Sequence, residues 1–116
     1  SAGDSRSFHT SEQVRHSSPR RRVKFVGTVV DIMKRTSRNG NKYARLEMQD
    51  ELGPVCGLFL DSDREERLTE YLSSGKVLPK KGDVAIITGD VGDDIVFVDT
   101  INTIEEKIYM KLSELK

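Results

Sequence analysis

This chain of 116 residues has no tryptophan and a single cysteine, Cys56. One cysteine cannot form a disulfide within the chain and fits a reducing compartment, so a cytoplasmic location is expected. The two histidines, His9 and His16, lie far from Cys56 in sequence, and no metal site or cofactor is predicted. No stretch approaches the roughly 18 consecutive apolar residues of a membrane-spanning helix, so no membrane association is expected. Aromatic residues are only 6% of the chain, which makes the place of each one informative.

Neither sign of charge is in excess, because 19 Lys and Arg are balanced by 19 Asp and Glu. This balance hides two basic regions. The first 24 residues carry six basic and two acidic side chains, and a second cluster contains basic side chains and no acid. The members of the second cluster are Lys34, Arg35, Arg38, Lys42 and Arg45. A ligand responds to charge within a Debye length of about 10 Å, so a zero net charge is compatible with an anionic partner.

Residues 1–22 are rich in Ser, Arg and His and lack apolar periodicity. Such a segment buries too little surface to offset its ordering entropy. The sequence therefore predicts a disordered basic leader or linker over residues 1–22 and a folded domain over 23–116. The run of three arginines at 20–22 has two interpretations: an arm that contacts nucleic acid, or a solvated charge run, which is favoured.

Three strands in an antiparallel meander are predicted, over residues 23–34, 42–49 and 55–60. The first is rich in β-branched residues and has apolar groups at both odd and even positions, which is typical of a long strand that curves between two halves of a core. Gly27 marks the expected bend. Between the first two strands, Asn39 and Gly40 form a strong hairpin signal because both tolerate a positive φ.

The hydrophobic period changes after the third strand. Residues 61–74 carry an apolar stripe at helical spacing, with Asp61 or Ser62 as the expected cap. Two further strands are predicted, over residues 84–89 and 95–101. This element order is that of the OB-fold, a mainly β, five-stranded Greek-key barrel with a helix between strands 3 and 4. Another small barrel or an open α+β sheet is the alternative, and residues 104–116 fit either a short C-terminal helix or an extended exit.

Several short motifs carry a family resemblance: VGTVV at 26–30, KRTSRNGNKYA at 34–44, LEMQDELG at 46–53 and GLF at 57–59. Through them, residues 24–115 resemble the OB domain near the C-terminus of bacterial DNA polymerase III alpha subunits. Similar patterns occur in anticodon-binding OB domains of class II aminoacyl-tRNA synthetases and in other single-strand-binding modules. The resemblance implies a nucleic-acid-binding OB domain of a replicative polymerase. Two features depart from the pattern: Arg45 stands where an aromatic residue often follows Ala44, and the turn at 90–94 is unusually acidic.

Ligands of OB-folds bind the outer face of strands 2 and 3 and the flanking loops. Tyr43, Arg45 and Glu47 alternate with three apolar residues, so they are expected to point outward from strand 2. The predicted nucleic-acid-binding residues are Lys34, Arg35, Arg38, Lys42, Tyr43 and Arg45. On this hypothesis the cations follow the phosphates while Tyr43 stacks on a base. The alternative is that Tyr43 covers the barrel rim and the cations only solvate a hairpin.

The other residues that could have a chemical function are expected to have structural roles. The strand pattern places Phe25 and Phe97 in the core and Phe59 in the core or at the rim, and it makes Cys56 a buried, unreactive thiol. The aspartates of residues 90–99 lack the spacing of a calcium-binding loop and predict a solvated turn. No catalytic constellation is found, so catalysis by this chain is not expected.

The sequence therefore favours a non-catalytic module, monomeric as an isolated domain, that holds single-stranded DNA or RNA and has other replication subunits as further partners. Two alternatives remain. The first is a protein-interaction OB domain that docks a partner subunit through residues 90–94, and the second is an RNA-binding module of the anticodon type. The binding face of OB-folds serves all three functions in different proteins, and the fold alone does not distinguish among them.

Overall fold

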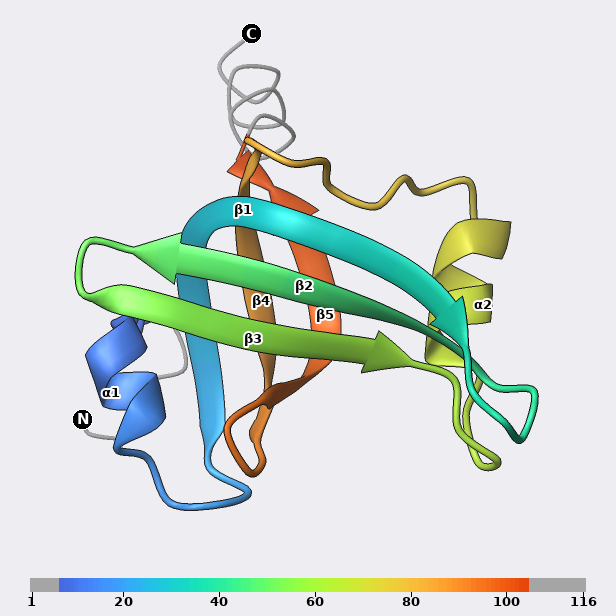
Figure 1. The fold of residues 1–116 in the computed structure, drawn as a ribbon, viewed down its shortest axis with the longest axis horizontal. Helices are drawn as coiled ribbons and strands as arrows, with labels where there is room; N and C mark the ends of the chain where they lie inside the picture. Colours follow the sequence, from blue (N-terminus) through green and yellow to red (C-terminus); the bar gives the residue numbers. More distant parts are fainter. Residues whose placement is uncertain (1–6, 105–116) are drawn as a thin grey trace, which may run out of the picture.

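Five strands close on themselves in the order β1-β2-β3-β5-β4 (Figure 1). The structure is a computed structural model that describes residues 7–104. Its elements are α1 (Ser11–Arg15), β1 (Arg22–Thr36), β2 (Lys42–Asp50), β3 (Gly53–Leu60), α2 (Arg67–Ser73), β4 (Val84–Val91) and β5 (Val96–Thr103). The predicted mainly β, five-stranded barrel with a helix between the third and fourth strands is confirmed. The expected C-terminal helix or extended exit falls almost wholly on residues outside the described range.

The long first strand is shared between the two halves of the barrel, as its apolar pattern predicts. Its first half, Arg22–Thr28, pairs with β4, and its second half pairs with β2. The strand bends between these halves (Figure 1), where the register with β2 shifts between Val29 and Asp31. At Gly27 the neighbours approach too closely for a side chain, because a Cβ atom there would lie 2.5 Å from the Gln49 carbonyl oxygen. The bend therefore requires glycine.

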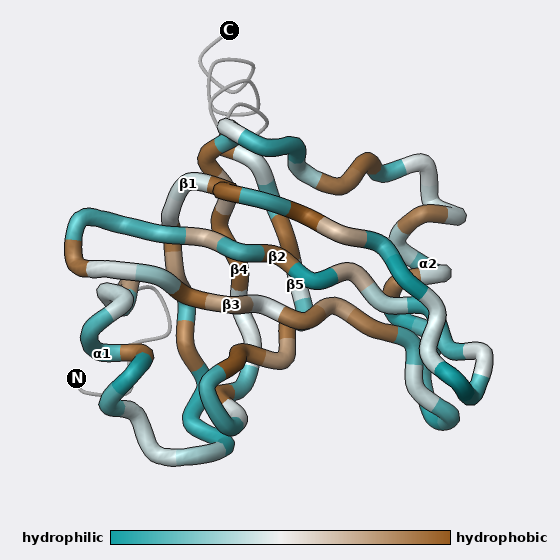
Figure 2. Tube along the Cα trace, viewed as in Figure 1, coloured by the Kyte–Doolittle hydropathy of each residue, from teal (hydrophilic) through white to brown (hydrophobic). Residues whose placement is uncertain are grey.

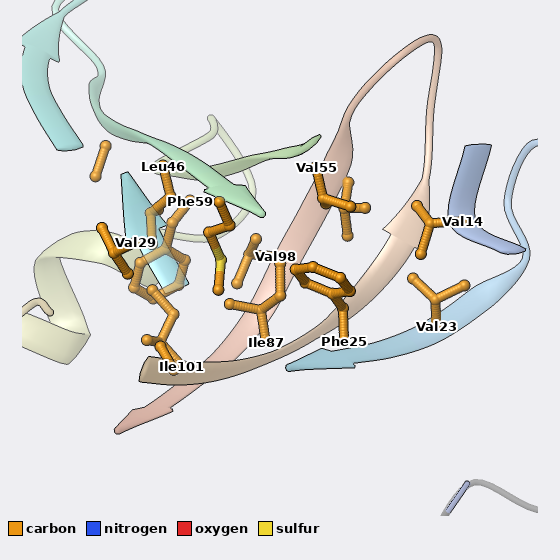
Figure 3. Close-up of a cluster of buried hydrophobic side chains, with 14 of the residues drawn as sticks. Val14, Val23, Phe25, Val29, Leu46, Val55, Phe59, Ile87, Val98 and Ile101 are labelled. Atoms are coloured by element: carbon orange, nitrogen blue, oxygen red, sulfur yellow. The ribbon is translucent and has the colours of Figure 1, made fainter. Parts of the chain in front are cut away.

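The barrel interior holds the core, and its side chains point toward one another from all five strands (Figure 3). Phe25 and Phe59 are almost completely buried, which confirms the predicted core position of Phe25 and places Phe59 in the core rather than at the rim. The ring of Phe59 meets the ring of Tyr71 from α2 edge to face, with centroids 5.3 Å apart. This contact fixes α2 against one end of the barrel.

Residues 7–22 differ from the prediction, which makes residues 1–22 a disordered leader. Thr10 and Gln13 form a capping box that starts α1, and Val14 on this helix joins the core beside Val23 (Figure 3). Ser11 is completely buried, and both its N–H and its hydroxyl donate to the Asp50 carboxylate. These contacts with the barrel stabilise a segment whose own sequence has too little apolar surface to fold alone.

The helix between β3 and β4 begins later than predicted, at Arg67 rather than near Asp61. Asp61 is instead buried, and its carboxylate accepts a hydrogen bond of 2.9 Å from the Thr69 N–H and another from the Thr69 hydroxyl. Asp61, which is predicted to cap the helix, thus binds the first turn of α2 from its position directly after β3. Within residues 7–104 no helix has the length and apolar character needed to cross a membrane.

Candidate nucleic-acid interface

The outer face of the sheet presents side chains in rows, because residues paired across adjacent strands point to the same side. One row crosses four strands and consists of Met33, Arg45, Leu58 and Phe97. The next row, nearer the β1–β2 turn, consists of Arg35, Tyr43 and Leu60. Together these two rows, which we call the arginine–aromatic face, place flat rings and guanidinium groups over an aliphatic floor. Such a combination suits bases and phosphates at once.

Tyr43 and Arg45 lie on this face as predicted. Tyr43 is half-buried, while its neighbours on the same strand, Ala44 and Leu46, are completely buried on the inner side. Arg45 is half-exposed, and its Nε lies 3.9 Å from the Glu47 carboxylate. An exposed pair at that distance contributes only about 0–1 kcal/mol, so the guanidinium remains available to an anionic ligand.

The predicted basic residues do not all lie together. Arg35 belongs to the arginine–aromatic face, and Arg38 is exposed in the β1–β2 turn, where Gly40 has a φ of +85°. Lys34 pairs with the buried Ala44, so its side chain points to the opposite side of the sheet from Arg35. Lys42 follows the same alternation and also lies opposite Tyr43. The structure thus places Arg35 and Arg45 on the same face as Tyr43, with Arg38 in the adjoining turn, and directs both lysines to the other side of the sheet.

Phe97 is a residue whose position the sequence analysis predicted wrongly. It was expected in the core, but its side chain is 43% exposed, and it pairs with Leu58 on the outer face. The neighbouring Val96 and Val98 are buried, so they face the core instead. All residues from 95 to 98 are apolar, so the alternation gave no signal of which side faces inward. The arginine–aromatic face therefore carries a second ring, on β5, two strands away from the ring of Tyr43 on β2.

A small pocket of about 230 Å³ adjoins Phe97 and Leu58. Its other wall consists of the segment between β3 and α2, which contributes Arg64, and of Arg67 at the start of α2. Arg67 is held in place, because its Nη1 lies 2.6 Å from Asp99 and its Nη2 lies 2.7 Å from Glu65. Arg64 is exposed and forms no ion pair with another described residue. The pocket thus extends the face toward a further cation.

This β3–α2 segment lies beside the β1–β2 turn (Figure 1), and Asn41 contacts Asp63 across the gap at 3.5 Å. The two loops flank the end of the face that carries Arg35 and Tyr43. The opposite end is acidic, because Asp31, Glu47 and Cys56 form the third row. Arg35 and Arg38 attract a polyanion to the loop end, where Asp63, Glu65 and Glu66 of the β3–α2 segment offset part of that attraction. The third row repels a polyanion from the other end.

Arg22, the last member of the arginine run, takes part in a different network. It forms ion pairs with Asp99 and with Asp90, the latter at 3.4 Å. The hydrogen bond with Asp99 is the main cause that raises the pKa of the Arg22 guanidinium above its usual value. Asp99 in turn holds Arg67, so the carboxylate links β1, β5 and α2. Arg22 is thereby a structural residue of the barrel rather than part of a free arm.

Cys56 is half-buried on the outer face, where it pairs with Glu47, rather than fully buried as expected. Burial raises the pKa of its thiol, so the reactive thiolate is disfavoured at neutral pH. Among residues 7–104 no group of three metal-ligating side chains comes together.

A second groove, of about 580 Å³, lies between α1, the start of β3 and the β4–β5 turn. Its walls are mostly apolar and include Val14, Val55 and Ile95. Asp93 and Asp94 of the acidic turn also line it. We call it the α1 groove. This groove could not be predicted from the sequence, because α1 forms one of its walls and residues 1–22 are predicted to be disordered.

Comparisons with known proteins support the fold without naming a family. No protein-family model matches the chain, and no curated protein matches it. Among solved structures, the second OB-fold domain of replication protein A from Methanococcus maripaludis is similar, with a TM-score of 0.59 and 18% sequence identity over 85% of this chain and 96% of that one. Yeast Stn1 and Ten1 are similar too, with a TM-score of 0.56 and 17% identity over 81% of this chain and 53% of that one. At these identities the comparisons establish an OB fold.

Proposed function

We propose that this domain is a non-catalytic module that binds single-stranded nucleic acid, with single-stranded DNA as its principal ligand. The observation that carries the proposal is the arginine–aromatic face. On it, Tyr43 and Phe97 offer two exposed or half-exposed rings, and Arg35 and Arg45 lie beside them in the same two rows. Stacking of bases on rings is sequence-tolerant, while guanidinium groups pair with phosphates.

The distribution of charge favours one path for the ligand. The single-stranded nucleic acid enters at the β1–β2 turn, where Arg38 is exposed, and crosses the rows of Tyr43 and Arg45. It leaves past Phe97 toward Arg64 in the β3–α2 segment. The acidic third row with Glu47 keeps the phosphates from the far end of the face, because like charges repel.

We further propose that the module belongs to a replicative polymerase, of the DNA polymerase III alpha kind. This proposal rests on the sequence motifs at 26–30 and 34–44, which resemble that family. The likeness to the replication protein A domain supports the OB fold that the proposal requires.

Titration with oligonucleotides tests the proposal. A fluorescein-labelled oligo-dT of about 15 nucleotides covers one OB-fold site, and its anisotropy measures Kd. If about three arginines each neutralise one phosphate, log K falls against log salt with a slope near −2, at about −0.7 per contact. Competition with an oligo-U of equal length distinguishes a DNA module from an RNA module of the anticodon type. An affinity that does not change with salt contradicts the mechanism.

The α1 groove supports a second candidate function, a protein-interaction module. Its apolar walls and its two aspartates, Asp93 and Asp94, fit a basic, apolar segment of a partner subunit. The double change Asp93→Asn and Asp94→Asn separates the two functions. It abolishes capture of a partner subunit through this groove and leaves the affinity for oligo-dT equal or slightly higher.

A further inference from the structure

A third concave surface lies on the other side of the sheet from the arginine–aromatic face, between the second half of β1 and the end of α2. Its volume is about 370 Å³, within the range of about 300–1,000 Å³ that small ligands and anchoring side chains occupy. We call it the α2 groove. Its lining residues are Ile32, Lys34, Leu72, Lys76, Val77, Leu78 and Pro79. Five of these seven are apolar.

Val77 is the apolar residue of the α2 groove that is presented to solvent. Ile32, Leu72 and Leu78 are half-buried against the core, and Pro79 is buried. Val77 is 66% exposed, more than any other large apolar side chain among the described residues. Figure 2 shows this stretch as a hydrophobic part of the otherwise polar connection between α2 and β4. The Tyr71 hydroxyl donates a hydrogen bond of 2.7 Å to the Val77 carbonyl oxygen, which fixes the backbone at this point. Val77 is thus held outward by a defined contact.

The polar part of the α2 groove is basic. No acidic side chain lines it, and within residues 7–104 neither Lys34 nor Lys76 takes part in an ion pair. The ammonium group of Lys76 lies 5.7 Å from the centroid of the Tyr71 ring, which orients it at the groove rim. Lys34 approaches from β1, on the side of the sheet opposite Arg35. Two cations therefore flank an aliphatic slot from two different elements.

We propose that the α2 groove docks an acidic, amphipathic segment of a partner protein. An apolar side chain of that segment enters between Leu72 and Val77, and its carboxylates pair with Lys34 and Lys76. A protein segment suits the groove better than nucleic acid, because the lining has aliphatic side chains and no aromatic ring on which a base could stack. The groove is thus separate from the proposed nucleic-acid site, and the two are tested separately.

The test uses a synthetic peptide of about 14 residues, or four helical turns, made of Asp and Glu with Leu and Phe at i, i+3, i+4 and i+7. Its matched control has the same apolar residues and Asn and Gln in place of the acids. Amide correlation spectra of the ¹⁵N-labelled full chain are recorded during titration with each peptide. The acidic peptide shifts the amides of residues 32–34, 72 and 76–78, and it binds about tenfold more tightly than the neutral control.

Two variants complete the test. The double change Lys34→Glu and Lys76→Glu weakens the acidic peptide at least tenfold, whereas Lys81→Glu, on the exposed turn before β4, changes its Kd less than twofold. Val77→Asp removes the apolar contact and weakens both peptides, and the domain still folds because the side chain is largely exposed. Equal binding of both peptides, or no shift in these residues at millimolar peptide, overturns the proposal. Displacement of the acidic peptide by oligo-dT also overturns it, because the groove then belongs to the nucleic-acid site.

Discussion

Replacing Phe97 by alanine tests whether its ring binds nucleic acid or stabilises the core. The ring is 43% exposed and rests on the β4–β5 turn, where a Cβ atom at Gly92 would lie 2.5 Å from it. Loss of one stacking surface costs about 1–3 kcal/mol per base, which corresponds to a Kd roughly 5- to 150-fold higher. The same change at the buried Phe59 costs about 3–5 kcal/mol of folding free energy instead. Phe97→Ala therefore weakens binding strongly and lowers the melting temperature only slightly.

The assay is anisotropy of labelled oligo-dT at one fixed salt concentration, with thermal unfolding of the same samples. Phe8→Ala is the matched control, because Phe8 is 47% exposed and its ring lies under Lys24, away from the arginine–aromatic face. This control leaves Kd unchanged. An unchanged Kd for Phe97→Ala, in a variant that is still folded, refutes the assignment of the second ring to the site.

Three further changes test other parts of the structure. Arg35→Glu raises the Kd for oligo-dT about tenfold and makes the salt slope shallower, whereas Lys34→Glu changes Kd less than twofold, since the two side chains point to opposite sides of β1. Gly27→Ala lowers the free energy of unfolding by about 1–3 kcal/mol in denaturant titrations, because its Cβ atom meets the Gln49 carbonyl oxygen. Burial opposes ionisation of Asp50, but hydrogen bonds from Ser11, Leu52 and Gly53 together outweigh it and keep the pKa of the carboxyl below its usual value. The contribution of this carboxylate to stability is therefore complete above about pH 4 and is lost as pH falls below that, and Asp50→Asn makes the fall in stability at acid pH less steep.

Much of the barrel could be predicted from local chemistry. The β-branched run of β1, the turn at Asn39 and Gly40, and the alternation of β2 each point to one structure. The alternation also placed Tyr43 and Arg45 on the outer face, because their neighbours along β2 are apolar. Where local propensity and the final fold agree in this way, the sequence is sufficient to predict the element and the side to which its residues point.

The rest depends on contacts between distant residues. α1 is ordered because Ser11 donates hydrogen bonds to Asp50, 39 positions away. This partner cannot be predicted from residues 1–22 alone. Phe97 faces outward because β5 pairs with β3 at Leu58, a parallel contact that a run of apolar residues does not specify. Lys34 and Arg35 are adjacent in sequence and equally basic, yet the strand directs them to opposite sides. A charge cluster in a sequence is thus not a cluster in space.

The most direct measurement is a ¹⁵N chemical-shift titration of the full chain with unlabelled oligo-dT. The account predicts that the shifted amides follow the two rows of the arginine–aromatic face, with the largest changes at Tyr43, Arg45 and Phe97 and little change at Lys34. Shifts confined to α1 and the β4–β5 turn, or no shift at millimolar oligonucleotide, contradict it.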